Sequence, residues 1–348
     1  MRQHGLNIVT IGGGTGLSTL LRGLKRYVDA DGSWSIANLG AIVTVTDEGG
    51  SSGVLRQEFG MLPPGDIRNC IVALAEEEQL LSRLFNYRFE RDSALKGHSL
   101  GNLLLMAMTE ITGGFDNAVL AASDILAIRG EIYPSTLEDV RLRATLADGT
   151  ELIGEVAISG SFIGEKPPTQ PQHARVVHLA IDPSDAAPPP RALEALAAAD
   201  LILIGPGSLY TSVLPNLLIK PIAETLRQVK ALRVYICNVM TQPGETDGYS
   251  AEDHLSAIIE HAGLVVDVMI INGRRPSESI LFNYAAQNQF PVQFDINSVR
   301  DLGVTPFFGD VIAEANYVRH DSAALAETIF RLYDRYGRTL ERMRRSEG

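Results

Sequence analysis

The sequence of 348 residues has only two cysteines, Cys70 and Cys237, and they lie far apart in the chain. Zinc sites and redox motifs space their cysteines a few residues apart, so this pair fits neither kind of site. Free thiols without a disulfide framework are typical of a reducing compartment. The sequence also lacks a signal peptide and any apolar run near the ~20 residues that span a bilayer. We therefore expect a cytoplasmic protein without a transmembrane segment.

Positive charge is scarce as well. The chain has 30 lysines and arginines against 42 aspartates and glutamates, which gives a net charge of −12 at pH 7. Binding of nucleic acid requires a basic surface that neutralises phosphates, so we expect no nucleic-acid partner. The exception is a predicted amphipathic C-terminal helix with a basic tail, residues 321–348. Such a set of charges is usually a solvated face, and an acidic partner or a membrane surface is the alternative.

Several short apolar runs bounded by turn residues are present. They predict buried strands of a parallel sheet that is covered on both faces. The runs occupy residues 8–11, 41–45, 201–204, 234–237 and 265–271. The composition is that of an ordinary globular protein, with 45% hydrophobic and 21% charged residues. The length allows one large α/β domain or two smaller ones.

Residues 131–182 follow a different pattern, in which apolar and polar residues alternate as in a half-exposed strand. The Asp-Gly pair at 148–149 is a strong hairpin signal, and Val156 and Ile158 continue the alternation on the predicted return strand. Prolines bound the region. The pattern predicts a β-rich excursion from the main sheet and no catalytic segment.

The first apolar run leads into a glycine-rich turn and then into a helix predicted from Leu17 to Tyr27. The turn reads Gly12-Gly13-Gly14-Thr15-Gly16. Glycine lets a ligand approach the backbone, and the free N–H groups at a helix N-terminus bind phosphate. Leu17 stands where the dinucleotide fingerprint needs its last glycine, and the Gly-Lys-Ser/Thr of a P-loop is absent. The turn therefore predicts a phosphate site without specifying NAD or ATP, and a turn without a ligand is the alternative.

A second turn of this kind follows residues 201–204. Its glycines and hydroxyl groups can donate hydrogen bonds to phosphate oxygens. They are Gly205, Gly207, Ser208, Thr211 and Ser212. Two such turns in one parallel sheet predict a diphosphate or an extended nucleotide between two halves of the chain, whereas a simple chain reversal is the alternative.

A polar loop follows the run at 234–237, again at the carboxyl end of a predicted strand. It carries Asn238, Thr241, Gln242 and Glu245. Side-chain amides in this place suit the recognition of a base or a sugar. We therefore count the loop as part of the predicted nucleotide site.

Two aspartates are the candidates for catalysis. Asp47 follows the run at 41–45, where ligands bind in parallel sheets, and could hold a metal, a sugar hydroxyl or a substrate proton. The alternative is that Asp47 caps its own loop. Asp66 has the sequence position of a helix N-cap, and capping alone would explain it. The other possibility is that Asp66 faces the pocket.

Another polar wall of the site is predicted from residues near these aspartates. His98 and Ser99 form this wall at a predicted helix start, and Ser51, Ser52 and Asn102 count with His98 among the predicted ligand-binding residues. The histidine precedes a predicted helix and is flanked by glycines, which favours a place in the site. A single histidine is more often structural, and that alternative stays open.

Six ordered motifs resemble the YvcK-type gluconeogenesis factor family, over about residues 5–320. They lie at residues 12–16, 44–53, 63–69, 97–102, 205–212 and 238–246. A related group is the CofD-type 2-phospho-L-lactate transferases of deazaflavin coenzyme biosynthesis. In the family the acidic loop more often reads Asp-Asp-Gly-Gly, whereas here Glu48 follows Asp47 and keeps the charge on a longer side chain.

The resemblance implies a three-layer α/β/α Rossmann-like fold with residues 1–320 as a single nucleotide-binding domain. It also implies a cytoplasmic protein that binds UDP-sugars such as UDP-N-acetylglucosamine and acts in cell morphogenesis and wall synthesis during gluconeogenic growth. Such a protein could form homo-oligomers and act on a regulatory protein partner.

Two functions stay open at this point. The absence of a nucleophile–base motif favours a ligand-binding regulator without turnover. The alternative is a CofD-like transferase that moves a phospholactyl-type group from a nucleotide diphosphate to an alcohol. Asp47 and Asp66 would then bind Mg²⁺ or activate the alcohol, because a diphosphate leaving group needs charge neutralisation. An NAD-dependent oxidoreductase is disfavoured by the missing fingerprint.

Overall fold

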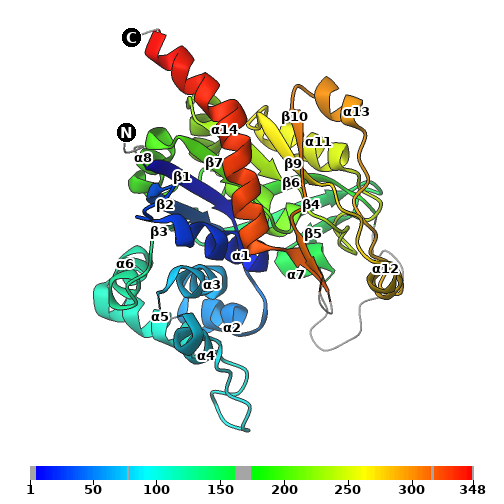
Figure 1. The fold of residues 1–348 in the computed structure, drawn as a ribbon. Helices are drawn as coiled ribbons and strands as arrows, with labels where there is room; N and C mark the ends of the chain where they lie inside the picture. The colour runs from blue at the N-terminus through cyan, green and yellow to red at the C-terminus, as the bar shows by residue number, and fades with distance from the viewer. Residues whose placement is uncertain (1–4, 77, 161–173, 315–316, 347–348) are drawn as a thin grey trace.

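The computed structural model describes residues 5–76, 78–160, 174–314 and 317–346; for residues 78–79, 81–82 and 338–346 only the backbone is described. Its centre is a seven-stranded sheet in which each strand pairs in parallel with its neighbours (Figure 1). The order is β10 (Thr305–Gly309), β9 (Val268–Asn272), β8 (Leu232–Ile236), β7 (Leu201–Ile204), β1 (Leu6–Gly12), β2 (Ile36–Val43) and β3 (Glu131–Pro134). The predicted Rossmann-like α/β fold is confirmed.

The strand order changes direction between β1 and β7. From β1 the chain proceeds through β2 to β3 on one side, and it later returns to β7 and continues to β10 on the other side. In open parallel sheets this is the point where the connections diverge and leave a crevice at the carboxyl ends of the strands. Both predicted glycine-rich turns follow the two strands that border this crevice.

Helices flank the sheet. Helix α1 (Gly14–Leu24) follows the first turn and begins three residues earlier than the predicted Leu17, because Gly13 is its N-cap. Helix α14 (Ser322–Ser346) crosses in front of the sheet in Figure 1 and packs on α1. The ring of Phe330 stacks on Trp34 at 5.0 Å between centroids. The other flanking helices are α8 (Pro190–Ala198), α9 (Leu214–Leu217), α10 (Lys220–Gln228), α11 (Ala251–Ala262) and α13 (Ile296–Asp301).

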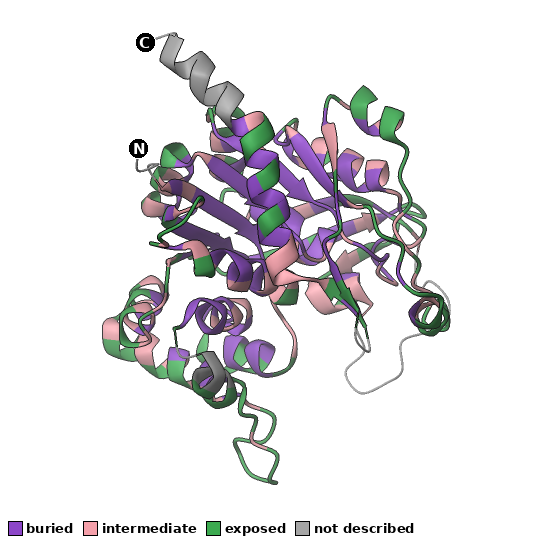
Figure 2. Cartoon of the chain, in the orientation of Figure 1, coloured by how far each residue is buried: buried purple, intermediate pink, exposed green. Residues whose placement is uncertain are grey.

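Five helices inserted between β2 and β3 lie together beside the carboxyl end of this part of the sheet (Figure 1). They are α2 (Gly50–Phe59), α3 (Gly65–Leu74), α4 (Glu78–Asn86), α5 (Leu100–Thr112) and α6 (Phe115–Ile125). Figure 2 shows that buried residues concentrate in the strands and on the inner helix faces, whereas exposed residues are frequent on this group. Within the described residues, no helix combines the length and apolar character needed to cross a membrane.

The region at 131–182 departs in part from the prediction. Its first strand, β3, is the edge of the main sheet, and the separate antiparallel sheet consists of β4 (Arg141–Leu146), β5 (Glu151–Ile153) and β6 (Val176–Asp182). Val156 and Ile158 do not continue a return strand but lie in the short helix α7 (Glu155–Ser159). The reason is Gly154, whose φ of +93° ends β5 and turns the chain so that Ile158 is buried.

The last part of the chain contains elements that the sequence patterns did not indicate. After helix α12 (Glu278–Ala285) come β10 and an antiparallel pair, β11 (Ile312–Glu314) and β12 (Val318–His320). These strands are short and carry few consecutive apolar residues, so no periodicity marks them. The basic tail predicted for the C-terminal helix involves side chains outside the described residues.

Candidate functional site

Two glycine-rich turns meet at the carboxyl ends of β1 and β7. The Gly205 N–H donates to the Ile11 carbonyl (2.8 Å), which extends the pairing of the two strands up to the turns. A Cβ on Gly16 would lie 3.0 Å from the Gly207 nitrogen and nearer still to the Pro206 carbonyl. The turns therefore contact each other backbone to backbone, and position 16 admits only glycine without a shift of one turn.

The two turns form one wall of a pocket of about 380 Å³, which we call the cradle. It lies over the N-terminus of α1, where free backbone N–H groups favour an anion. Residues from three predicted motifs line it: Gly13, Gly14, Thr15, Gly16, Gly207, Ser208, Ser212, Asn238, Thr241 and Gln242. The fold thus brings the first turn, the second turn and the polar loop into one concave site.

Two residues predicted to bind the ligand, Thr211 and Glu245, instead hold the second turn from behind. Glu245 is only 5% exposed. Its carboxylate accepts hydrogen bonds from the Ser208 hydroxyl, the Thr211 hydroxyl (3.2 Å) and the Tyr210 N–H (3.3 Å). A buried carboxylate with several donors fixes their geometry, so Glu245 holds Ser208, Tyr210 and Thr211 of the second turn in place.

Asn238 fixes the same turn from the polar loop. Its Nδ2 donates to the Gly207 carbonyl (2.7 Å), and its Oδ1 accepts the Gly207 N–H (3.3 Å). The Asn238 Nδ2 also donates to Gln242 Oε1 (3.2 Å). Gly12 is the last residue of β1, and Gly205 follows the last residue of β7, so both lie at the base of the turns.

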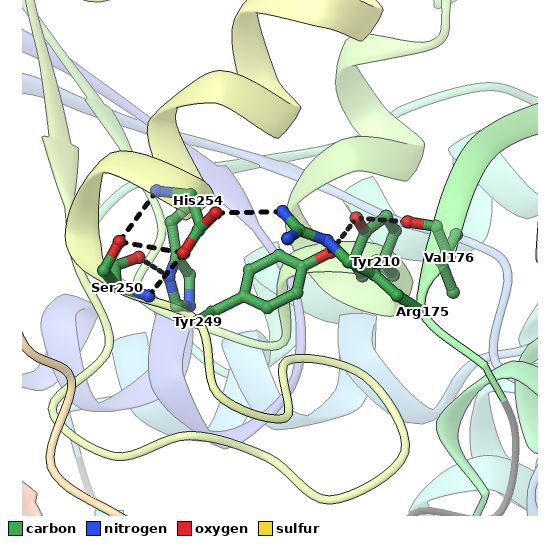
Figure 3. Close-up of polar contacts among 7 residues, drawn as sticks. Arg175, Val176, Tyr210, Tyr249, Ser250 and His254 are labelled. Carbon is green, nitrogen blue, oxygen red and sulfur yellow. Dashed lines mark hydrogen bonds and ion pairs between the residues drawn. The ribbon is translucent and has the colours of Figure 1, made fainter. Parts of the chain in front are cut away.

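Figure 3 shows a polar network that supports the second turn from further out. Arg175 Nε donates to the Tyr249 hydroxyl (3.0 Å), which lies 2.7 Å from the Tyr210 hydroxyl, and Tyr210 in turn donates to the Val176 carbonyl (3.2 Å). Arg175 also pairs with Asp253 (3.0 Å) and lies over the Tyr249 ring. Tyr210 belongs to the π-helix η2 (Leu209–Val213), a type of helix often found at functional sites. The network ties β6 to the second turn.

Asp66 does not cap a helix. The N-cap of α3 is Pro64, and the Asp66 side chain turns toward the first glycine-rich turn, where it accepts the Gly14 N–H. A Cβ on Gly13 would lie 2.5 Å from Asp66 Oδ2, so glycine permits this approach. Burial, followed by the charge of Asp47, raises the pKa of Asp66 to about 7. Asp66 therefore lies against the first glycine-rich turn, and its role in the site stays a prediction.

Glu155 joins the two aspartates, although it comes from the region predicted to be non-catalytic. The Glu48 N–H donates to Glu155 Oε2 (3.4 Å). Burial, followed by the charge of Asp47, raises the pKa of Glu155 to about 7. We call Asp47, Asp66 and Glu155 the carboxylate cluster. The tertiary docking of α7 places Glu155 there, and we find no sequence signal that could have revealed it.

The predicted polar wall forms around Arg68, next to the carboxylate cluster. Arg68 Nη1 donates to Ser99 Oγ (2.7 Å) and to Asn102 Oδ1 (3.1 Å). Two further contacts complete the wall, Ser51 Oγ with His98 Nδ1 (3.1 Å) and Asn102 Nδ2 with Ser52 Oγ (3.3 Å). The structure thus brings Ser51, Ser52, His98 and Asn102 together, beside the carboxylate cluster and apart from the lining of the cradle.

The cradle also has a wall that sequence reasoning missed, made by α12 and β12. Tyr284, Gln289, Arg319 and His320 line it. The Tyr284 hydroxyl donates to the Val318 carbonyl (3.2 Å) and accepts the Val318 N–H (3.1 Å), which fixes β12. Arg319 adds a positive charge beside the helix N-terminus. Burial lowers the pKa of His320 to about 4, so its imidazole is neutral at pH 7.

Carboxylate oxygens, such as those of the carboxylate cluster, are ligands that divalent cations prefer. Among the described residues, no group of three histidine, cysteine or acidic side chains has the arrangement of a metal site. Mg²⁺, however, usually takes one or two carboxylates and completes its shell with water and substrate phosphates. Asp66 lies against Gly13 of the cradle and has Asp47, whose Oδ1 accepts the Gly49 N–H (2.9 Å), as a charged neighbour. These two carboxylates meet that lesser requirement.

Comparison with known proteins identifies the family. The sequence profile described as 2-phospho-L-lactate transferase CofD matches residues 8–312. The chain belongs to the CofD family. A gluconeogenesis factor from Halalkalibacterium halodurans is 45% identical over 327 residues, which cover 93% of this chain and 95% of the relative. The gluconeogenesis factor of Bacillus subtilis is 42% identical over 325 residues, which cover 92% and 96%.

A solved structure agrees with this result. The crystal structure of a UPF0052 family member from Bacillus halodurans superposes with a TM-score of 0.85 at 44% identity, and the match covers 94% of this chain and 100% of that chain. The predicted resemblance to the gluconeogenesis factors and to CofD is thereby confirmed.

Proposed function

We propose that this CofD-family protein binds a UDP-sugar with its diphosphate in the cradle. The observation that carries the proposal is the convergence of two glycine-rich turns on one pocket over a helix N-terminus. Backbone N–H groups of the two turns, the hydroxyl of Ser212 and the charge of Arg319 are suited to phosphate oxygens. The cradle thus offers donors and positive charge in a chain whose net charge is −12.

In this proposal the protein is a cytoplasmic, ligand-binding regulator of cell morphogenesis and wall synthesis during gluconeogenic growth. Residues 1–320 form the ligand-binding domain, and the helix at 321–348 is appended to it. The relatives from Halalkalibacterium halodurans and Bacillus subtilis are gluconeogenesis factors, which supports this physiological setting. A regulator would act by presenting a ligand-dependent surface to a protein partner.

The second candidate function is transfer of a phospholactyl-type group from a nucleotide diphosphate to an alcohol, which the family description favours. The observation that supports it is the carboxylate cluster beside the cradle. Asp47 and Asp66 would hold Mg²⁺, which would neutralise charge on the diphosphate leaving group. A carboxylate with a pKa of about 7, such as Glu155, could accept the proton of the alcohol near neutral pH.

Binding is tested by thermal unfolding with UDP-N-acetylglucosamine. A ligand that binds only the folded state at 100 times its Kd stabilises the protein by about 2.7 kcal/mol, so the Tm should rise by a few degrees. Ser208→Ala and Arg319→Ala should reduce this rise, whereas Arg91→Ala, at an exposed position on the α4–α5 loop, should keep it. A Tm that is unchanged by the UDP-sugar would contradict the proposal.

Turnover separates the two functions. The protein is incubated with UDP-N-acetylglucosamine and Mg²⁺, and released UDP and sugar are measured by chromatography. The regulator function predicts no release. Mg²⁺-dependent release that Asp47→Asn abolishes would instead identify a transferase or hydrolase.

A further inference from the structure

A second and larger pocket, of about 720 Å³, opens next to the cradle at the carboxyl ends of β8 and β9. The two pockets share three lining residues, Asn238, Val239 and Gln289. A ligand whose phosphates occupy the cradle can therefore extend into the second pocket without leaving the protein surface. Because of its lining we call it the aromatic pocket.

Three phenylalanines line the aromatic pocket, Phe282, Phe290 and Phe294. Their exposed fractions are 76%, 48% and 42%. An exposed phenylalanine leaves apolar surface in water, and a group of such rings around one opening is typical of a binding site. Gln289 and Gln293 add amide donors and acceptors to the same lining. Flat apolar rings with a few amides are the side chains that proteins use to hold a planar base.

The position of Phe290 is coupled to the cradle. The Phe290 N–H donates to Thr241 Oγ1 (2.9 Å), and the Thr241 N–H donates to the Phe290 carbonyl (2.8 Å). Thr241 is only 3% exposed and itself lines the cradle. The backbone that carries the Phe290 ring is therefore hydrogen-bonded to the loop that faces the predicted diphosphate.

The opposite side of the site has different chemistry. The carboxylate cluster and Glu48 lie toward β2 and α7, and burial, followed by the charge of Asp47, raises the pKa of Asp66 and of Glu155. The hydroxyls of a sugar or an acceptor alcohol can donate to these carboxylates, but the carboxylates give a flat base no apolar face on which to stack. The two sides of the cradle therefore differ in the group that each can hold.

From this contrast we propose that the aromatic pocket takes the nucleobase by stacking on Phe282 and Phe290. The diphosphate then crosses the cradle, and the sugar points to the carboxylate cluster. This inference rests on the proposed function, since it assigns the two ends of the same nucleotide ligand. It makes Phe282 and Phe290 binding residues for the base. It also predicts that these two side chains contribute nothing to the binding affinity for a ligand that has no base.

The experiment is calorimetric titration of the full chain with UDP and with inorganic pyrophosphate. Loss of base–aromatic stacking weakens binding about tenfold or more. We expect the double variant Phe282→Ala/Phe290→Ala to bind UDP at least about tenfold more weakly and pyrophosphate within about twofold of wild type. The control is Phe59→Ala, which removes a ring of similar exposure, 55%, from α2 without touching either pocket. It should bind both ligands as wild type does.

Saturation-transfer NMR gives an independent readout. The H5 and H6 protons of uracil should receive saturation from wild type, and the double variant should lose this transfer. Wild-type affinity for UDP in the double variant would overturn the base assignment and leave the proposed function intact. An equal loss of affinity for UDP and for pyrophosphate in the double variant would also overturn the base assignment, because the rings would then only support the cradle. If wild type itself bound UDP no better than pyrophosphate, both the assignment and the proposed nucleotide function would fail.

Discussion

At the scale of single residues, two carboxyl groups at the site, those of Asp66 and Glu155, have pKa values raised to about 7. Asp66 lies next to the Gly14 N–H, which favours its charged form, yet burial and the neighbouring Asp47 outweigh that hydrogen bond. The same balance acts on Glu155. Two carboxyl groups that titrate near pH 7 make the charge of the site sensitive to pH, and a cation or a cationic group on a ligand would change that charge.

Asp66 gives a prediction for the pH dependence of stability. Its pKa rises from 3.8 in a model compound to about 7 in the folded protein, so the folded state binds the proton more tightly than the unfolded state. Its contribution is fully present below about pH 4 and is lost as the pH rises to 7. We expect Asp66→Asn, which stays neutral and can still accept the Gly14 N–H, to be more stable than wild type by about 1–3 kcal/mol at pH 8.

The measurement is urea unfolding of wild type and Asp66→Asn at pH 5 and pH 8 without divalent cations. The gain in stability should be smaller at pH 5. Asp92→Asn, at a fully solvated ion pair with Lys96, serves as the control and should show no gain at pH 8. An Asp66→Asn variant that is equally destabilised at both pH values would contradict the assignment of the shifted pKa.

At the scale of elements, the small antiparallel sheet and the helix that follows β5 contact the candidate site. Its strand β6 reaches the second glycine-rich turn through Arg175, Tyr249 and Tyr210 (Figure 3). Its helix α7 contributes Glu155 to the carboxylate cluster. A region predicted to be a structural excursion therefore contacts the candidate site from two directions.

The tyrosine network predicts the effect of Tyr249→Phe. The variant removes the hydroxyl that accepts from Arg175 and contacts Tyr210, so the free energy of unfolding should fall by about 1–2 kcal/mol. Because Tyr210 lies in η2, the second turn should also loosen, and UDP-sugar affinity should fall about threefold or more. Chemical unfolding and calorimetry measure the two effects.

Tyr87→Phe is the matched control, because Tyr87 is 55% exposed and lies on the surface after α4. It should leave both quantities unchanged. If Tyr249→Phe lowered stability but bound the UDP-sugar as tightly as wild type, the network would support the fold without positioning the turn.

At the scale of the whole molecule, the site exists because two halves of one sheet meet. Strands β1 to β3 form one side of the parallel sheet, and strands β7 to β10 form the other side. Each half supplies one glycine-rich turn at the border between β1 and β7. Gly16 is the point where the turns touch. A change there tests whether both halves are needed at once.

We expect Gly16→Ala to push the second turn away, because its Cβ would collide with the Pro206 carbonyl. Overpacking of this kind costs about 1–3 kcal/mol of stability, and the cradle should lose most of its affinity for the UDP-sugar. Gly32→Ala is the control, since its Cβ would lie 3.7 Å from the nearest atom, the Trp34 carbonyl oxygen. Unchanged affinity in Gly16→Ala would show that the ligand does not need the contact between the turns.

The sequence by itself determined the local elements of this protein. Apolar runs marked β1, β2, β7, β8 and β9 because strands buried on both faces need apolar residues at consecutive positions. Glycines marked the turns because a close backbone approach leaves no room for a Cβ. These signals were enough to predict a phosphate site between two halves of the chain.

Only the tertiary structure decided which side chains meet at that cradle. Glu155, Arg319 and the phenylalanines of the aromatic pocket come from short elements whose sequences carry no period and no motif. Asp66 satisfied the sequence rule for a helix cap, yet Pro64 took that role and the carboxylate turned to the first glycine-rich turn. Convergence of this kind depends on strand order and on how distant elements dock, and neither is recorded in the local spacing of residues.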